Sequence, residues 1–226
     1  MNTVRFLLLD WDGCIANTLQ IWMQTYLSLY RDVGIFVTPD DVIAHSWGNL
    51  SGGPKYFGIT DYEAFWEKIV MQVKIGVAKV DLYPGVKETL MSIKQMNIPM
   101  SIVTSSERQL IMPALQYHGL DAVIDYVVTE EDVKKPKPDP EMLYLAMMKM
   151  HGSLEHSLIV GDTEKDILAG KNCGMCTALV LHPENRRFYT FDTHSTLNPE
   201  YILHSFQDLL PVLKQSLIQQ SEQSPT

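Results

Sequence analysis

Short runs of apolar residues recur along the chain, and their length and spacing predict buried β-strands. These runs cover residues 4–9, 98–103, 123–128, 157–160 and 176–181. Between and after them, apolar positions recur with helical spacing at residues 85–96, 107–118, 140–151, 164–173 and 199–217. Strands of about five residues that alternate with helices of about ten indicate βαβ units. The pattern therefore predicts an α/β fold, with a doubly wound parallel sheet that is covered by helices on both faces.

Residues 17–80 interrupt this alternation. They contain amphipathic helical patterns, for example at 19–30 and 62–75, and no strong strand pattern. Proline and glycine residues separate these helical patterns from one another. We therefore expect an inserted all-α domain at 17–80, and a core domain that is built from residues 1–16 and 81–226.

The composition narrows the classes of function. The chain has 226 residues and a net charge of −9, so binding to nucleic acid, which uses a basic surface, is not expected. No apolar run approaches the roughly 20 residues of a membrane span, and residues 1–9 make a poor signal peptide. A cytoplasmic protein without membrane contact is therefore the expectation. Three cysteines argue against a disulfide framework, and we expect Cys173 and Cys176 to pack in the interior rather than to serve redox or metal chemistry.

The first predicted strand ends in the sequence Asp-Trp-Asp-Gly, which carries two carboxylates. Residues i and i+2 of an extended chain face the same side, so Asp10 and Asp12 can point into one cavity, and Gly13 allows a sharp turn after them. One carboxylate can attack phosphorus while the other protonates the leaving oxygen and later deprotonates water. Aspartates are also common at turns, so this motif alone does not decide between catalysis and structure.

A pair of hydroxyl residues follows the second predicted strand. Thr104 and Ser105 come directly after the apolar run at 98–103. At the end of a strand and the start of a helix, a hydroxyl and a backbone N–H can bind phosphate oxygens. The alternative is that one of the two side chains only caps the following helix.

A lysine- and proline-rich segment at residues 134–140 offers a cation. Chemistry on a phosphorylated aspartate needs a fixed positive charge to offset the charge on the nucleophile and the phosphate. Neighbouring prolines restrict the chain around such a lysine. We choose Lys135 for this role and take Lys137 as a solvated side chain. Outside this context, a proline- and lysine-rich run is typical of a linker.

The segment at residues 158–166 combines a buried strand with two more carboxylates. Asp162 and Asp166 lie four positions apart at the start of a helix, which places both on one helical face. Together with Asp10 they offer the hard oxygen ligands that suit Mg²⁺. Acidic residues also stabilise helix N-termini without any metal. Because all four motifs fall at the carboxyl ends of predicted strands, where open α/β sheets bind ligands, we favour a metal site.

Taken in this order, the four motifs resemble those of the haloacid dehalogenase superfamily, and the resemblance covers nearly the whole chain. It implies a Rossmann-like core, and the insertion is similar to the helical cap of the branch that contains phosphoglycolate phosphatase and β-phosphoglucomutase. The resemblance implies four catalytic roles: Asp10 as nucleophile, Asp12 as general acid and base, Thr104 as phosphate binder and Lys135 as the neutralising lysine. It also implies that Mg²⁺ is held by Asp10, the backbone carbonyl of Asp12 and Asp162, with Asp166 in support.

Individual residues favour a phosphatase within this superfamily. Dehalogenases lack the second aspartate of the first motif, and phosphonoacetaldehyde hydrolases have alanine there, so Asp12 argues against both. Mutases similar to β-phosphoglucomutase usually carry a histidine where this chain has Trp22, and Glu-Asp where it has Gly161 and Asp162. We therefore expect a magnesium-dependent phosphatase that hydrolyses a small phosphorylated metabolite through an aspartyl phosphate. A sugar phosphomutase and a non-catalytic binding module are the alternatives, and phosphoglycolate, sugar phosphates, nucleotides and pyrophosphate are all open as substrates.

The insertion carries the remaining expectations. By resemblance, a substrate-binding loop that reaches from the cap into the active site contains Gly48, Asn49 and Ser51. Five aromatic residues are expected in the interior of the cap rather than on a stacking surface: Trp22, Tyr26, Trp47, Phe57 and Trp66. Cys14 and Asn17 depart from the residues usual in the superfamily, and an exposed Cys14 would make activity sensitive to oxidation. We expect a monomer or a weak homodimer.

Overall fold

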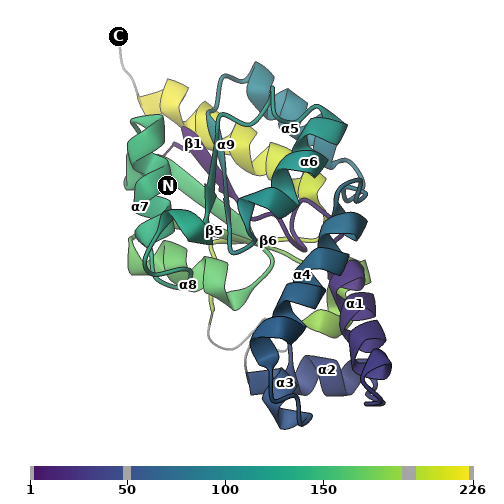
Figure 1. Ribbon diagram of the computed structural model, residues 1–226. Coiled ribbons are helices and arrows are strands. Elements are labelled where there is room, and N and C mark those ends of the chain that lie inside the picture. Colours follow the sequence, from purple (N-terminus) through teal and green to yellow (C-terminus); the bar gives the residue numbers. More distant parts are fainter. Residues whose placement is uncertain (1–2, 48–51, 190–196, 224–226) are drawn as a thin grey trace.

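A single parallel sheet forms the centre of the protein (Figure 1). The computed structural model describes residues 3–47, 52–189 and 197–223. In this part of the chain the sheet has the strand order β3-β2-β1-β4-β5-β6. The strands are β1 (Phe6–Leu9), β2 (Met100–Thr104), β3 (Tyr126–Thr129), β4 (Ser157–Gly161), β5 (Cys176–Val180) and β6 (Tyr201–Leu203). Because β1 lies between β2 and β4, the winding reverses direction at β1.

Helices and short 3₁₀ turns connect the strands. The α-helices are α1 (Leu19–Asp32), α2 (Pro39–His45), α3 (Gly52–Tyr56), α4 (Tyr62–Val77), α5 (Val86–Gln95), α6 (Arg108–His118), α7 (Glu141–Met150), α8 (Glu164–Asn172) and α9 (Leu209–Gln223). The 3₁₀ helices are η1 (Glu130–Asp132), η2 (Leu154–His156), η3 (Pro183–Phe188) and η4 (Phe206–Asp208).

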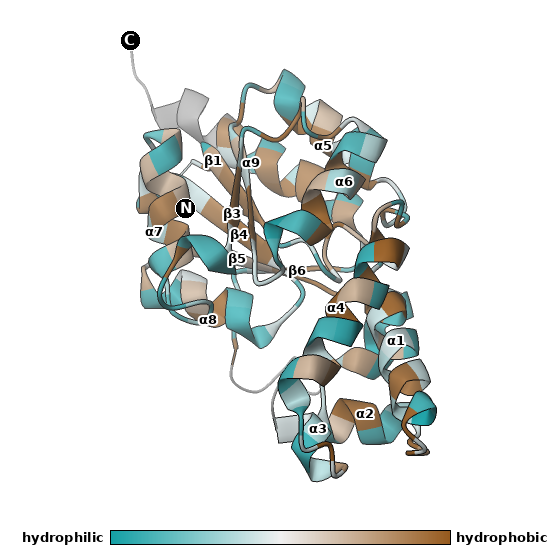
Figure 2. Cartoon of the chain, in the orientation of Figure 1, coloured by the Kyte–Doolittle hydropathy of each residue, from teal (hydrophilic) through white to brown (hydrophobic). Residues whose placement is uncertain are grey.

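The sheet is buried on both faces because side chains of its strands alternate between two hydrophobic clusters. In β1, Leu7 and Leu9 pack with residues of α5, α6 and α9, whereas Leu8 packs with residues of α7 and α8. The hydropathy colouring shows the same arrangement, with apolar strands inside and polar residues on the outer faces of the helices (Figure 2). The predicted α/β class with a doubly wound parallel sheet is therefore confirmed.

One predicted element is wrong at its start. The sequence pattern gave a helix over residues 199–217, but the segment first forms β6 and η4, and α9 begins only at Leu209. Ile202 and Leu203 pair with Leu179 and Val180 of β5. Pairing at the edge of the sheet satisfies the backbone groups of this apolar segment, and the sequence pattern around it could not show that a strand edge was available.

The helices α1 to α4 form a separate group, here called the helical unit, beside the sheet (Figure 1). Helix α1 contributes an apolar stripe with helical spacing to its interior: Leu19, Met23, Tyr26 and Tyr30. The aromatic residues of the insertion lie in or against the same cluster, as predicted, and the rings of Trp22 and Trp66 stack with centroids 5.9 Å apart. The two chain segments that join the unit to the sheet run side by side, with an antiparallel bridge between Ala16 and Leu82.

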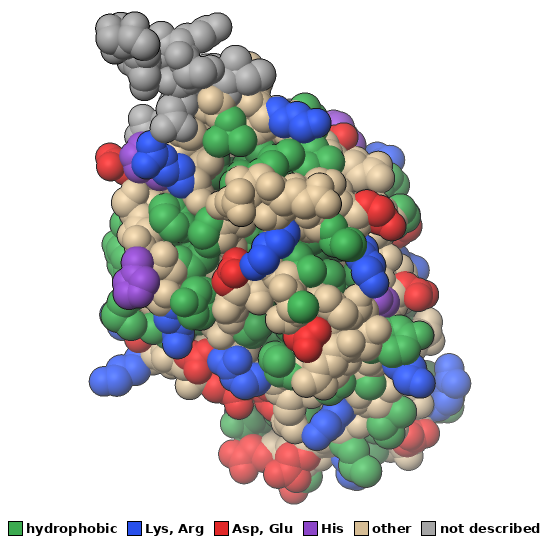
Figure 3. Space-filling model, turned by 90° about the horizontal axis from the view of Figure 1, so that it is seen from above, with side chains coloured by type: hydrophobic (Ala, Val, Ile, Leu, Met, Phe, Trp, Pro, Cys, Tyr) green, Lys and Arg blue, Asp and Glu red, His purple; other side chains and the backbone are tan. Residues whose placement is uncertain are grey.

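The surface carries charges of both signs. On the face shown in Figure 3, basic, acidic and apolar side chains are interspersed, and the basic ones do not merge into a continuous stripe. Among the residues that the structure describes, no helix combines the length and the apolar character needed to cross a membrane.

Candidate active site

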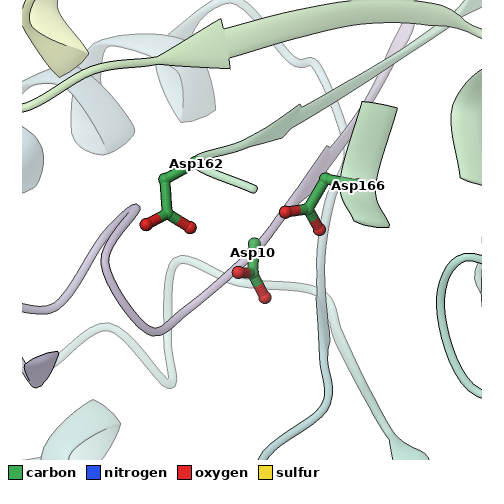
Figure 4. A group of neighbouring side chains, drawn as sticks. All are labelled: Asp10, Asp162 and Asp166. Carbon is green, nitrogen blue, oxygen red and sulfur yellow. The ribbon is translucent and has the colours of Figure 1, made fainter. Parts of the chain in front are cut away.

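Three buried carboxylates meet where the winding of the sheet reverses. Asp10 directly follows β1, Asp162 directly follows β4, and Asp166 lies in the first turn of α8. Their carboxyl groups face a common space (Figure 4), and one oxygen atom of each lies within 4.8 Å of the others. Doubly wound sheets bind ligands in the crevice at such a switch point, at the carboxyl ends of the strands. The fold therefore brings together Asp10 and Asp162, which lie more than 150 positions apart in the sequence.

Lys137 is the cation of this cluster. Its ammonium group lies 2.8 Å from Asp10 Oδ1 and 2.5 Å from Asp166 Oδ1, and it also donates to the carbonyl oxygen of Val103 at 2.9 Å. Lys135, which the sequence analysis preferred, is a surface residue with a 74% exposed side chain, 4.0 Å from Asp139. The expectation for Lys135 is therefore wrong, and the lysine that was taken as solvated is the buried one.

Asp166 and Asp162 differ in what satisfies their oxygen atoms. Asp166 Oδ1 accepts from Lys137, and its Oδ2 accepts from the backbone N–H and the hydroxyl of Thr163, at 3.1 and 2.6 Å. Asp162 is 1% exposed, and neither of its carboxylate oxygens has a hydrogen-bond partner among the described residues. A buried ionised group without partners is costly, so the site as built calls for a cation beside Asp162.

The pKa shifts of the carboxylates also indicate a place for a cation in this cluster. Burial raises the pKa of Asp10 to about 7, with a further increase from the neighbouring Asp166, although Lys137 acts in the opposite direction. Burial and the charge of Asp10 also raise the pKa of Asp162 well above its ordinary value. When all three carboxylates are ionised they face one ammonium group, and a divalent cation beside them would balance the remaining negative charge and favour the ionised forms that burial disfavours.

Two glycines make this crowding of carboxylates feasible. Gly13 has a φ of +76°, and a Cβ atom there would overlap the Asp162 carboxylate. A Cβ atom on Gly161 would overlap the side chain of Asp166. Only glycine allows the backbone to approach the carboxylates this closely, and at Gly13 it also tolerates the left-handed conformation.

Asp12 lies on the rim of the cluster, where two donors hold it. Ser106 donates its hydroxyl to Asp12 Oδ2 at 2.5 Å, and the indole N–H of Trp22 points to Asp12 Oδ1 at 3.4 Å. Trp22 belongs to the helical unit, whereas Ser106 follows β2. Side chains of both parts of the protein lie close together next to this contact: Trp11, Asp12, Trp22, Val73, Val77, Ser106 and Leu110.

The remaining predicted site residues fall into three groups. Thr104 is buried at the end of β2 and accepts a hydrogen bond from the backbone N–H of Ser106, and Ser105 is exposed. The residues expected in the substrate-binding loop lie outside the described part of the chain: Gly48, Asn49 and Ser51. Cys14 is fully buried, and burial raises the pKa of its thiol, so it lacks the exposure that sensitivity to oxidation would need.

Comparison with known proteins settles the family. The family model described as haloacid dehalogenase-like hydrolase matches residues 7–180, which is most of the chain and contains all four motifs. The chain belongs to this family. The expected superfamily and the expected enzyme class, a hydrolase, are thereby confirmed.

Relatives within the haloacid dehalogenase-like family extend over almost the full length. A protein named pyrophosphatase PpaX from Halalkalibacterium halodurans is 31% identical over 221 residues, covering 94% of this chain and 97% of that protein. A protein of the same name from Bacillus anthracis is 30% identical over 223 residues, covering 94% and 96%.

Solved structures of the family share the fold. A predicted phosphoglycolate phosphatase from Haemophilus somnus matches with a TM-score of 0.79 at 20% identity, covering 94% of this chain and 99% of that one. A β-phosphoglucomutase from Clostridium difficile matches with a TM-score of 0.76 at 15% identity, covering 98% and 100%. At these identities the likeness establishes the architecture and leaves the reaction to the site itself.

Proposed function

We propose that this protein is a magnesium-dependent phosphatase that hydrolyses a small phosphorylated metabolite through an aspartyl phosphate on Asp10. One observation carries the proposal. Asp10 and Asp162 lie side by side and buried, Lys137 binds Asp10, and the oxygens of Asp162 have no partner in the described chain. A site with this donor set fits a hard divalent cation and a phosphate group together.

The residues present would hold Mg²⁺ in a definite way. Asp10, Asp162 and the backbone carbonyl of Asp12 are the proposed ligands. Asp166 is fully engaged with Lys137 and Thr163, so we assign it to holding the lysine rather than the metal. When bound, magnesium supplies positive charge that offsets the negative charge of the nucleophile and the phosphate.

Asp10 and Asp12 divide the chemistry. The Asp10 carboxylate attacks phosphorus, the bond to the leaving oxygen breaks, and Asp12 gives that oxygen its proton. Asp12 then takes a proton from water, which attacks the acyl phosphate, releases inorganic phosphate and restores Asp10. The Ser106 hydroxyl suits both states of Asp12, because it can donate to the carboxylate and accept from the protonated acid.

Lys137 would offset the negative charge of the phosphate, and Thr104 would help to position it. Lys137 keeps a positive charge 2.8 Å from the nucleophile, where negative charge accumulates during the transfer. Thr104 closes the neighbouring strand, and Ser105 follows it at the start of the loop. We assign these two hydroxyl residues to the phosphate oxygens.

The helical unit would act as a cap over the site. It corresponds to the expected inserted domain at residues 17–80. It meets the rest of the protein at the catalytic edge of the sheet, through the bond from Trp22 to Asp12 and the packing of Val73 and Val77 next to Leu110. Closure of such a cap excludes bulk water from the reacting groups.

Pyrophosphate is the first substrate to test, because the relatives named pyrophosphatase PpaX align with 94% of the chain. Phosphoglycolate, sugar phosphates and nucleotides complete the panel. We expect phosphate release from few of these compounds, in the presence of Mg²⁺ and not with EDTA.

The decisive variant is D10N, which keeps the shape of the nucleophile and removes its reactivity. It should lower phosphate release by a factor of about 10⁴ or more, since covalent catalysis is then impossible. D121N is the matched control, because Asp121 is exposed. Persistent activity of D10N would refute the aspartyl phosphate. Isomerisation of a sugar phosphate without phosphate release would instead identify a phosphomutase.

A further inference from the structure

A short segment after β5 contacts the turn that follows Asp12. It comprises His182 and the 3₁₀ helix η3 (Pro183–Phe188), and none of the four motifs includes it. Three of its side chains are buried: His182, Asn185 and Phe188. Loops of this kind are usually polar and exposed, so buried polar side chains in one of them need a structural reason.

Asn185 has no exposed surface, and both ends of its amide are used. Its Nδ2 donates to the carbonyl oxygen of Gly13 at 3.0 Å, and its Oδ1 accepts from the hydroxyl of Tyr83 at 2.7 Å. The two partners fix the orientation of the amide group, since the carbonyl can only accept. The side chain therefore ties the turn after Asp12 to the segment where the chain returns from the helical unit.

His182 forms a hydrogen bond with the next peptide group of the same turn. Its Nε2 lies 2.9 Å from the carbonyl oxygen of Cys14, and this carbonyl requires a proton on that nitrogen. The imidazole ring stacks on Tyr83 with ring centroids 3.7 Å apart and planes inclined by 7°. Burial lowers the pKa of His182, which keeps the ring neutral in this position.

Phe188 anchors the far end of η3 in the helical unit. Its ring stacks on Trp47 with a centroid distance of 4.8 Å, and it belongs to the hydrophobic cluster of α1 to α4. The segment is therefore fixed at both ends, at the catalytic turn through Asn185 and at the helical unit through Phe188.

We infer that Asn185 is a positioning residue, which acts through the Gly13 carbonyl and sets the direction of the peptide groups that follow Asp12. This inference rests on the proposed function, because the Asp12 carbonyl is a proposed ligand of Mg²⁺ and its side chain is the proposed acid. The Gly13 carbonyl that Asn185 holds belongs to the peptide unit after the one that bears the Asp12 carbonyl. The two units share the Gly13 Cα atom, so a shift of the first would be passed on to the Asp12 carbonyl. The Gly13 turn also lies against Asp162, so a displaced turn would disturb two of the proposed ligands.

The test compares N185L with Y83F. N185L keeps the approximate volume of the side chain and removes both hydrogen bonds, whereas Y83F removes only the bond to Asn185 and keeps the one to Gly13. For N185L we expect a Mg²⁺ affinity at least tenfold weaker by titration calorimetry and a kcat at least tenfold lower, with KM changed less than threefold. For Y83F and for N97D at an exposed turn, we expect both quantities within about threefold of wild type.

The stability of each variant is measured by urea unfolding in the presence of EDTA. If N185L and Y83F weaken Mg²⁺ binding equally, or if N185L binds as wild type does, the inference is overturned. If N185L does not fold, N185S replaces it. Its shorter side chain does not span the distance to Gly13, so the same losses of Mg²⁺ affinity and kcat are expected. If the wild-type protein releases no phosphate at all, the proposed function fails, and calorimetry still decides the role of Asn185.

Discussion

At the scale of single residues, the site depends on how buried charges are shared. Lys137 lies between Asp10 and Asp166 and is 5% exposed, so it contacts both carboxylates in a place where water screens little. The two oxygens of Asp162 have no such partner in the described residues. These contacts distinguish Asp166, which holds the lysine, from Asp162, whose oxygens are available to bind a cation.

Removal of the lysine charge should stop catalysis. In K137M the side chain keeps its length, but the negative charge that develops on Asp10 and phosphate is no longer balanced. We expect kcat for phosphate release to fall by about 10²–10³. K135M is the matched control and should stay within about twofold, because the Lys135 side chain is 74% exposed. The opposite ranking would return the role to Lys135. Circular dichroism of both variants excludes a loss of fold.

Loss of the Ser106 hydroxyl should weaken the acid and base step. S106A leaves Asp12 Oδ2 without its donor at 2.5 Å. A hydrogen bond to a charged group is worth about 1.5–3 kcal/mol, so kcat should fall about tenfold or more. S92A, on the exposed hydroxyl that bonds to Glu88 in α5, should leave kcat unchanged. An unchanged kcat in S106A, measured with the same substrate, would show that Ser106 does not position Asp12.

Sequence reasoning found the carboxylates because their spacing is local and strongly patterned. Asp10 and Asp12, or Asp162 and Asp166, carry their geometry within one strand end or one helical turn. Lys137 was missed although the chain contained a signal: prolines flank it on both sides, at 136 and 138, whereas Lys135 has a proline only after it. Ser106 had no comparable signal, because its partner Asp12 lies 94 positions away.

At the scale of elements, α4 and α6 form the main contact between the helical unit and the rest of the protein. Leu110 of α6 is buried, and it belongs to the hydrophobic cluster of the helical unit rather than to those of the sheet. Lys74 of α4 also bonds to Gln109 of α6 at 2.9 Å. The two parts therefore share apolar surface, and we expect them to unfold together.

Truncation of Leu110 tests this junction. L110A removes buried methyl groups between α4 and α6, and we expect the free energy of unfolding in urea to fall by about 2–5 kcal/mol in a single transition. M91A, at a 47% exposed position of α5, should change it by about 0.5 kcal/mol or less. A loss below about 1 kcal/mol, or two separate transitions, would mean that the helical unit is attached only loosely.

The elements that the sequence predicted well are those with strong local patterns. The strands from β1 to β5 and the helices α5 to α8 all lie at or near the expected positions. The edge strand β6 was predicted as helix because its three residues gain their partner only from β5. The relation between η3 and the catalytic turn was also beyond prediction, since Asn185 and Gly13 are 172 positions apart.

At the scale of the whole molecule, the cluster connects parts that are distant in sequence. Asp10 comes from β1, Asp162 from the end of β4, and Lys137 from the loop before α7, while Trp22 of the helical unit contacts the rim at Asp12. A cation at this point would stabilise the entire fold, because it binds the folded arrangement and not the unfolded chain.

Removal of the Asp162 charge should change the melting temperature in opposite directions with Mg²⁺ and in EDTA. With Mg²⁺ a hundredfold above its Kd, the wild-type protein should gain about 2.7 kcal/mol, a rise in Tm of roughly 5–10 °C. D162N should gain almost nothing, whereas D121N, at an exposed aspartate, should behave as wild type.

In EDTA the order of the melting temperatures should reverse, with D162N more stable than the wild-type protein. Without a metal, burial and the charge of Asp10 raise the pKa of Asp162, so its carboxyl is either charged without a partner in the described chain or protonated at a cost that the unfolded chain does not have. The neutral amide avoids this cost. Relief equal to one pKa unit is about 1.4 kcal/mol, so D162N should melt roughly 3–5 °C above wild type. A lower Tm of D162N in EDTA would show that the Asp162 carboxylate is satisfied within the protein and is not kept for a metal.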